Sequence, residues 1–596
     1  MNFGSLCKRF NELINTNHVV WKHKFKFMYP VIFEVAEKFS DGNWLNDFKD
    51  FMKHKQLVYR ELITMSPKHY WKIDDITPQD VSYFFEIAST NSRSYYYTIY
   101  ILQDIIRKGN KVLNNFQSKK PYTLTEIHYA KSVVRCLIHC YMAVKWVKAQ
   151  ISHELPPEIV INYFLQWIDT VNLHLNEDVE DQLQHLANKV KIHLDKMHSD
   201  QLVKSNDKRY TPGQIFIAVS QVLFHQRHMA LTTIANLDTL DIVKIVREKN
   251  VNDSIEDESD SSSSSSSQSG KPALKRRNSK EDPDFEDLIN QVWAHKYGNQ
   301  IVVFAIFQAV AKRCGAECEL IVFSNHLFLE WRSDESEPNA QVFTINVATG
   351  ELEPKRRCPF AQSNQNARYK YSADSLLQCL HSSFLKTMGA IKSWMTQNAS
   401  DLLGFLGGNN SIHSQYDIFY KYLFRLIDMA GLNSNLNLKN LTERELQIIS
   451  MLVHVSTGAT NKAVKISKVK KHHSGVLFAV GMICYHKEHE YVCIIRGWDL
   501  TCGPEWRASI PKKDLSFGHK QPFYHVLAAD QSDRYVAQEN LIALTHPTRL
   551  YHLEEFVAKE FLHFDGFSYV LNDEKRLEYP DEDPIVEVFR RRSHVA

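Results

Sequence analysis

Apolar positions in the first 250 residues recur mainly at the spacing of an α-helix. Side chains three and four residues apart are apolar over 132–147, 158–168 and 215–224, which is the period of an amphipathic helix. The same spacing returns over 376–427 and 443–455. The pattern therefore predicts a mostly helical first half and a second helical region later in the chain.

Two other regions have the composition of strands. Residues 319–331 and 341–347 are rich in β-branched and aromatic side chains. They follow a stretch that indicates helices, which Gly315 is placed to end. Short apolar runs also follow one another from residue 477 onward, at 477–485, 491–497, 523–529 and 534–537. We expect a multidomain α+β protein with a small C-terminal β-barrel.

One composition break separates these regions. Residues 253–269 read DSIEDESDSSSSSSSQS, and the basic run KPALKRR follows. Because this stretch has almost no apolar residues to bury, it cannot offset the conformational entropy that it would lose on folding. Residues 250–283 are therefore predicted to be a disordered insertion. Ser279 follows two arginines and an asparagine, a form that basophilic kinases favour, and is a phosphorylation candidate. The basic run could equally be a nuclear localisation signal or a solvated tail.

Composition narrows the function classes. The chain has 596 residues, and 71 Lys+Arg against 69 Asp+Glu give a formal charge of +2, so nucleic-acid binding would need a local basic patch. The longest apolar run, 301–307, is too short for a membrane span, and no secretory signal is visible. Ten scattered cysteines favour reduced thiols in the cytoplasm and/or nucleus.

Familiar cofactor motifs are missing from the sequence. It contains no His-Glu-x-x-His zinc motif and no phosphate-binding Gly-x4-Gly-Lys-Ser/Thr loop. Cys136 and Cys140 lie four residues apart, but no second half of a zinc site is evident, so core packing is the better interpretation. We expect neither a metal nor a cofactor.

The C-terminal stretch, 475–590, carries aromatic and amide positions in a characteristic order. They are Val480-Gly481, His486-Lys487, 491–502 (YVCIIRGWDLTC), Glu505-Trp506, 521–527 (QPFYHVL) and 535–541 (YVAQENL). In these positions the stretch resembles the hemimethylated-DNA-binding, YccV-like domain. Its aromatic and amide side chains form either core or a recognition wall. The recognition candidates are Trp498, Trp506, Gln521, Phe523, Tyr524, Gln538 and Asn540.

DNA is a disfavoured ligand for this stretch. Residues 476–545 hold seven Lys/Arg and eight Asp/Glu, a net charge of −1, whereas duplex binding depends on neutralising phosphates. A protein or small ligand is the better expectation. The lysines of the preceding basic linker, 461–474, keep a DNA-associated regulator open as an alternative.

Residues 284–350 combine a helix with two strands. Gly298-Asn299-Gln300 opens the helix, and residues 325–331 and 344–346 follow as strands. This arrangement is similar to the transglutaminase-like superfamily. The resemblance implies a cysteine at the helix N-terminus, a histidine on the next strand and an aspartate on a third. The chain has Gln300 at the first position, His326 at the second and Asn346 at the third.

This degenerate set predicts a scaffold without a catalytic residue. Glutamine is no nucleophile, and no cysteine occurs at 296–303. Cys314 falls at the other end of the helix, where the helix dipole disfavours a thiolate. A cysteine transferase or protease is the alternative, and His326 would otherwise be an ordinary structural histidine.

The N-terminus combines a helical apolar stretch, residues 6–14, with Val20-Trp21-Lys22. In these residues it resembles the second half of an F-box, which implies docking of a Skp-family adaptor and, through it, a cullin. The candidate adaptor-binding residues are Leu6, Cys7, Phe10, Leu13 and Trp21. The Leu-Pro start of an F-box is absent, so either the sequence is truncated or adaptor docking is lost.

The resemblances together give the expected organisation and function. The regions are a partial F-box helix remnant (1–30), a helical first part (75–249) of a largely helical transglutaminase-like middle, the insertion (250–283), a transglutaminase-like core (284–350), a helical extension (351–460), the basic linker (461–474) and the YccV-like barrel (475–590). The expected function is that of a non-enzymatic substrate receptor in an SCF-type ubiquitin ligase, with an unknown protein substrate.

Overall fold

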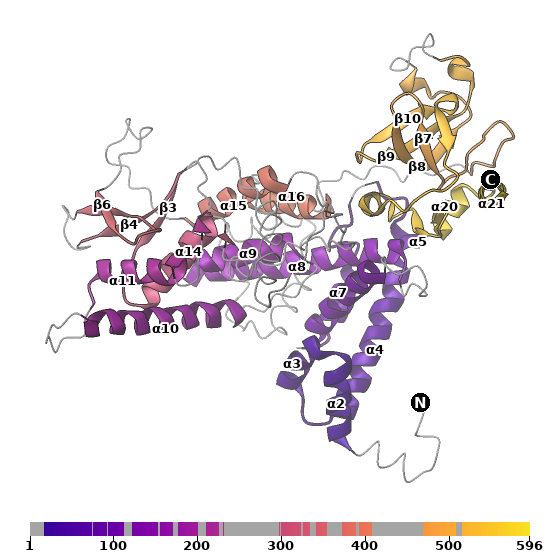
Figure 1. Cartoon of the computed structure of the whole chain (residues 1–596). Coiled ribbons are helices and arrows are strands. Elements are labelled where there is room, and N and C mark those ends of the chain that lie inside the picture. The colour runs from indigo at the N-terminus through magenta and orange to yellow at the C-terminus, as the bar shows by residue number, and fades with distance from the viewer. Residues whose placement is uncertain are drawn as a thin grey trace, which may run out of the picture. The chain divides into compact units, whose positions relative to one another are not determined.

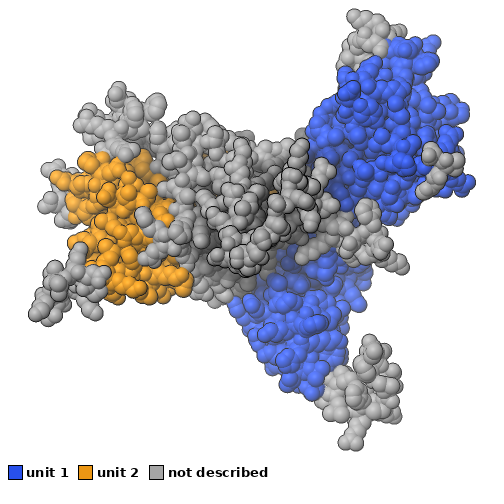
Figure 2. Space-filling model, viewed as in Figure 1, with its two compact units in different colours: residues 1–141, 411–441, 453–596 blue, residues 142–410, 442–452 orange. Residues whose placement is uncertain are grey.

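The architecture was analysed in a computed structural model. It describes residues 17–73, 75–91, 93–112, 122–152, 155–170, 177–200, 210–225, 230–231, 297–298, 300–323, 326–333, 341–354, 372–388, 393–407, 469–507 and 515–595. The chain divides into two compact units, coloured separately in Figure 2. Unit 1 combines residues 1–141 with 411–441 and 453–596, and unit 2 combines residues 142–410 with 442–452.

The chain before residue 141 is helical. Its helices are α2 (His18–Met28), α3 (Pro30–Phe39), α4 (Trp44–Ile63), α5 (Met65–His69), α6 (Ser82–Ala88), α7 (Ser94–Val112) and α8 (Leu124–Ser152), which continues into unit 2 (Figure 1). Asparagine caps start two of them: the Asn17 side chain accepts from the Val20 N–H, and Asn43 starts α4 in the same way. Phe25 is fully buried among the rings of α4.

Unit 2 packs helices around a small antiparallel sheet. Its helices are α9 (Pro157–Ile168), α10 (Glu177–Asp200), α11 (Pro212–Ser220), the π-helical turn η2 (Gln221–His225), α14 (Gln300–Arg313), α15 (Ala373–Met388) and α16 (Ser393–Gly407). The sheet has the order β3 (Glu319–Phe323), β4 (His326–Arg332), β5 (Val342–Ile345), β6 (Leu352–Pro354). The short strands β1 (Ala230–Leu231) and β2 (Tyr297–Gly298) pair separately. The apolar helix α14 contacts β3 and β4 (Figure 1).

The C-terminal part of unit 1 contains a five-stranded antiparallel sheet. Its order is β10 (Asp533–Ala537), β9 (Phe523–Ala528), β8 (Tyr491–Asp499), β7 (Ile483–His486), β11 (Leu541–Ala543). Short 3-10 turns interrupt it: η5 (Pro504–Trp506), η7 (Gly518–Lys520), η8 (Gln538–Asn540) and η9 (Tyr551–Leu553). The chain then forms α19 (Glu554–Val557), the hairpin β12 (Phe561–Phe564) and β13 (Tyr569–Leu571), α20 (Asp573–Glu578) and α21 (Asp583–Val595).

The predicted barrel is corrected to an open sheet in the part of the chain that the structure describes. Each strand is antiparallel to its neighbours, so the edge strands β10 and β11 run in the same direction. Closing the sheet would therefore require a parallel β10–β11 pair, which needs a crossover of a dozen or more residues. Only the turn η8, Gln538–Asn540, joins them.

The C-terminal region shares buried contacts with the N-terminal helices of unit 1. Leu124, at the start of α8, belongs to the same apolar cluster as the C-terminal sheet. The Ser66 hydroxyl donates to the Glu574 carboxylate at 2.6 Å, and the Thr125 hydroxyl donates to the Phe561 carbonyl at 3.1 Å. Both contacts are buried, so the two segments stabilise one another.

The mixed α+β class and the helical first half are confirmed. The predicted insertion with Ser279 lies outside the described residues, as do residues 408–468 of the helical extension and linker. Within the described ranges, no helix combines the length and apolar composition that crossing a bilayer requires.

Candidate recognition site on the C-terminal sheet

The C-terminal sheet has two faces with different roles. Trp498 and Tyr524 are register partners on β8 and β9 and belong to the main apolar cluster. Asp499 pairs with Phe523, and His525 pairs with Tyr535. Because side chains alternate between the two faces of a strand, these four residues share the opposite face.

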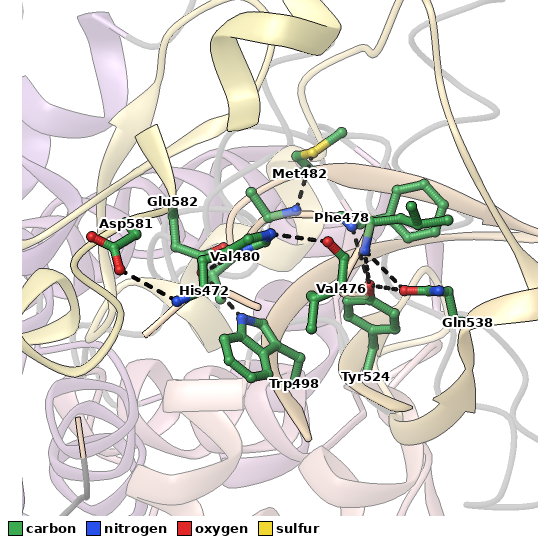
Figure 3. Close-up of polar contacts among 12 residues, drawn as sticks. His472, Val476, Phe478, Val480, Met482, Trp498, Tyr524, Gln538, Asp581 and Glu582 are labelled. Carbon is green, nitrogen blue, oxygen red and sulfur yellow. Dashed lines mark hydrogen bonds and ion pairs between the residues drawn. The ribbon is translucent and has the colours of Figure 1, made fainter. Parts of the chain in front are cut away.

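Two predicted recognition residues are core residues. Trp498 is 3% exposed and Tyr524 is fully buried. The Tyr524 hydroxyl donates to Gln538 Oε1 at 2.7 Å and accepts from the N–H groups of Leu477 and Phe478, each at 3.1 Å (Figure 3). Tyr524 and Gln538 therefore hold the chain that enters the sheet, and the buried Tyr524 ring offers no surface to a ligand.

A buried carboxylate completes this inner network. Glu582, at the start of α21, accepts from the Trp498 indole N–H at 3.1 Å and from the Val480 N–H at 2.6 Å. His472 Nδ1 lies 3.4 Å from the same carboxylate (Figure 3). Glu582 is 1% exposed, so its contacts fasten the C-terminal helix to the sheet.

The outer face carries an aromatic stack. Trp506, from the turn η5, stacks on Tyr535 with ring centroids 5.3 Å apart, and Phe523 also stacks on Tyr535, with centroids 5.2 Å apart. Phe523 is fully buried, whereas Trp506 is 37% exposed. Among the aromatic residues predicted to recognise a ligand, only Trp506 offers surface to one.

A polar group lies beside this stack. Asp499 Oδ2 accepts from the Tyr535 hydroxyl at 2.9 Å and lies 3.1 Å from His525 Nε2, while Oδ1 accepts from Lys470 Nζ at 2.8 Å. Burial alone would raise the pKa of the Asp499 carboxyl, but hydrogen bonds from His525, Lys470 and Tyr535 lower it well below its usual value. We call Asp499, Trp506, His525 and Tyr535 the outer-face cluster.

The sequence interpretation missed the polar part of this cluster. The signal was present, because His525 lies two residues after Phe523 and so must share its face of the strand. Tyr535 was included only among the positions that resemble the YccV-like domain, and not among the recognition candidates. Its position opposite His525 depends on the register of β9 and β10, which one sequence does not specify.

The remaining predicted residues stabilise loops. Gln521 Nε2 donates to the Gly518 carbonyl at 3.1 Å, and its Oε1 accepts from the Glu539 N–H at 3.0 Å. The Asn540 carbonyl accepts from the Lys487 N–H at 2.8 Å. The linker residue Lys470 is also engaged, through its contacts with Asp499 and the Trp498 carbonyl.

The transglutaminase-like positions lie in unit 2. Gln300 is the first residue of α14, His326 begins β4, and Asn346 directly follows β5. The β4–β5 register pairs Leu329 with Ile345, so positions 326 and 346 lie toward the same end of the sheet.

The Asn346 side chain is part of a turn. Its Nδ2 donates to Glu353 Oε1 at 3.0 Å, and its Oδ1 accepts from the Ala348 N–H at 3.1 Å. The turn ends at Gly350, whose φ is +75°, and a Cβ there would meet the Phe216 carbonyl at 2.4 Å. Asn346 thus serves the β5–β6 connection.

Neither described cysteine near α14 has the environment of a nucleophile. Burial raises the pKa of the Cys314 thiol, and burial with two neighbouring glutamates raises that of Cys318 to about 12. Both thiols therefore stay protonated at neutral pH.

Of the predicted adaptor-binding residues, only Trp21 lies among the described residues. Its ring contacts Phe48 of α4 with centroids 5.2 Å apart, and Lys24 Nζ lies 4.5 Å from its centroid. Trp21 therefore fastens α2 to α4 within the chain. Leu6, Cys7, Phe10 and Leu13 lie outside the described residues.

Comparisons with known proteins agree with the order of these regions. The pattern of the hemimethylated DNA-binding protein YccV-like family matches residues 476–566, and that of the transglutaminase-like superfamily matches residues 276–388. F-box only protein 21 of Mus musculus is 22% identical over 612 aligned positions, which cover 97% of this chain and 88% of that protein.

Two further relatives match a shorter stretch more closely. The F-box only protein 21 sequences of Pongo abelii and Homo sapiens are each 40% identical over 121 residues, or 20% of this chain and 19% of those proteins. No solved structure matches the chain. The chain is therefore a homologue of F-box only protein 21 along nearly its whole length, with a transglutaminase-like region followed by a YccV-like region.

Proposed function

We propose that this protein is a substrate-recognition subunit of an SCF-type ubiquitin ligase and has no catalytic residue of its own. The observation that carries the proposal is its similarity to F-box only protein 21 over 97% of its length. Its N-terminal part would dock a Skp-family adaptor and, through it, a cullin. Ubiquitin transfer would take place on other subunits, and the target would be a protein bound elsewhere on this chain.

The surface of α2 and α3 is suited to docking a partner. Large apolar side chains are exposed along both helices: Val19, Val20, Phe27, Met28, Val31 and Phe39. Phe27 is 89% exposed, and Val20 lies seven residues before it, on the same face of α2. A concentration of exposed apolar side chains is typical of a protein-interaction surface, and we call these six residues the N-terminal apolar surface.

The middle region supports the proposal as a scaffold. The position expected for a nucleophile holds Gln300, Asn346 is engaged in a turn, and the described thiols nearby are held protonated. These features favour a structural role for the transglutaminase-like fold over cysteine transferase or protease chemistry.

The test is the affinity of the full chain for a purified Skp-family adaptor, measured by biolayer interferometry. Phe27→Asp should weaken binding at least tenfold, because it places a charge in an apolar interface. Ile73→Asp is the matched control, since Ile73 is 63% exposed but lies outside α2 and α3, and it should leave binding unchanged. Binding that is unaffected by both Phe27→Asp and Val20→Asp would contradict the proposal.

A further inference from the structure

We propose that the outer-face cluster is the target-binding site of this protein and that it binds an arginine side chain of the target. The inference rests on the proposed function, because it names the chemistry by which a substrate receptor would hold its substrate. Of the aromatic residues that the sequence pattern indicated, only Trp506 belongs to this site, since Trp498, Phe523 and Tyr524 are all buried.

The geometry leaves one hydrogen-bond acceptor open to a ligand. His525 Nε2 lies 3.1 Å from Asp499 Oδ2, so the tautomer that donates from Nε2 to this carboxylate presents Nδ1 as an acceptor. Among the described residues, Nδ1 has no hydrogen-bond partner, and the His525 side chain is 45% exposed. A ligand that binds here must therefore offer a donor.

The rest of the cluster is rigid. Tyr535 fixes the carboxylate from one side and Lys470 from the other, and the Tyr535 hydroxyl accepts from the Gly503 N–H at 3.1 Å. The Tyr535 ring lies against His525, with centroids 4.7 Å apart. A site whose groups are held in advance loses little entropy when a ligand binds.

The exposed ring of Trp506 selects a planar cation among the possible donors. Trp506 is stacked on Tyr535 and remains more than one-third exposed. A guanidinium group stacks on indole through cation–π attraction and carries several N–H donors in one plane. Trp506 and His525 both contact the Tyr535 ring, with centroids 5.3 and 4.7 Å from it, so we place one arginine against the Trp506 ring with an N–H directed to His525 Nδ1.

Charge favours a cationic protein segment over a nucleic acid. At the site itself, Lys470 is paired with Asp499, and Glu505 and Arg507 flank Trp506, so acidic and basic groups balance, while residues 476–545 as a whole carry a net charge of −1. This surface therefore has no excess of positive charge to attract phosphates. A nucleobase could also stack on Trp506, so the experiment must distinguish the two ligands.

The experiment uses fluorine NMR of the full chain labelled with 5-fluorotryptophan. The Trp506 resonance is assigned by its absence in Trp506→Phe. The probe is a nine-residue Gly-Ser peptide with a central arginine, compared with the same peptide carrying citrulline, which keeps the planar shape but lacks the charge. We expect a saturable shift of the Trp506 resonance with the arginine peptide and at least tenfold weaker binding of the citrulline peptide.

Matched variants locate the contact. His525→Ala should weaken binding of the arginine peptide about tenfold, a loss of about 1.4 kcal/mol, whereas Phe517→Ala, which removes an exposed ring of the same region, should not change it. The absence of a saturable Trp506 shift, or equal binding of the two peptides, would overturn the proposal. A shift by oligothymidine with none by the arginine peptide would also overturn it and would identify a nucleic-acid surface. Adaptor binding is measured separately, so either proposal can fail alone.

Discussion

The four-stranded and the five-stranded sheet of this protein each place a polar residue at the end of a strand, and the two residues serve different purposes. Asn346 follows β5 in unit 2, and its amide holds the turn to β6. Asp499 ends β8 in unit 1, and its carboxylate orients a histidine, a tyrosine and a lysine. A polar side chain that satisfies its own backbone is not available for chemistry, whereas one that reaches across strands can organise a site.

The largest expected effect separates the two faces of the C-terminal sheet. Trp498→Ala should lower the free energy of unfolding of this region by about 3–5 kcal/mol, because it leaves a cavity in the core and removes one hydrogen-bond donor from the buried Glu582 carboxylate. Trp506→Ala should lower it by at most about 1 kcal/mol, since Trp506 is partly exposed. Native-state hydrogen exchange of β8 and β9 measures both. Equal effects of the two substitutions would show that the faces do not differ.

The next largest effect is a pH dependence that comes from the buried histidine of β7. Burial, with smaller contributions from His489 and Arg534, lowers the pKa of His486 to about 4. In the unfolded chain this histidine has a pKa of about 6.5, so it takes up a proton at a higher pH than in the folded chain. The contribution of His486 to stability is therefore complete above pH 6.5 and is lost as the pH falls toward 4. The expected loss between pH 7 and pH 5 is about 2 kcal/mol.

The measurement is hydrogen exchange of β7 and β8 at pH 7 and pH 5, corrected for the intrinsic exchange rate. His486→Gln should remove most of the difference, because its side chain does not titrate. His525→Gln is the matched control from the exposed face and should keep the difference. A pH dependence that is the same in wild type and His486→Gln would contradict the assignment.

A reciprocal exchange tests the comparison of the two strand ends directly. Asp499→Asn replaces charge-assisted hydrogen bonds to Lys470 and His525 by weaker neutral ones, and we expect a loss of about 1–2 kcal/mol. Asn346→Asp replaces the amide nitrogen that lies 3.0 Å from Glu353 Oε1 by a carboxylate oxygen. We expect the repulsion between the two carboxylates to lower the free energy of unfolding by about 1 kcal/mol.

Local hydrogen exchange in each unit gives the two free energies, and pairing Asn346→Asp with Glu353→Gln should restore stability. Asp499→Asn should also weaken binding of the arginine peptide, because the ring of His525 loses its orientation. If Asn346→Asp changes nothing while Glu353 is intact, the turn does not depend on the amide.

The smallest expected effect is at the thiols of the transglutaminase-like region. A cysteine-directed probe such as iodoacetamide should leave Cys318 unlabelled in the native chain at pH 7, because burial keeps its thiol protonated. Labelling of the urea-unfolded chain is the control, and peptide mass spectrometry measures both. Rapid native labelling of Cys314 or Cys318 that is lost in His326→Ala would revive the cysteine-enzyme alternative.

The sequence determined the features that depend on local pattern. Helical periodicity predicted the helices over 132–147 and 158–168, which the structure places within α8 and α9. The enriched β-branched and aromatic runs predicted the strands of both sheets. These features follow from side chains close together in the chain, whose spacing is the same before and after folding.

Only the tertiary structure decided which aromatic residues face a ligand and whether the sheet closes. The sequence offered no reason to distinguish Trp498 from Trp506 as recognition candidates. In the structure, Trp498 belongs to the main core, whereas Trp506 lies on a turn and stacks on Tyr535 of the opposite face. The direction of β10 and β11, the contact between Asp499 and His525, and the shared core with Leu124 all depend on strand register and on contacts distant along the chain. A single sequence shows how apolar and polar side chains alternate along each strand, but it does not show which strands are neighbours in the sheet.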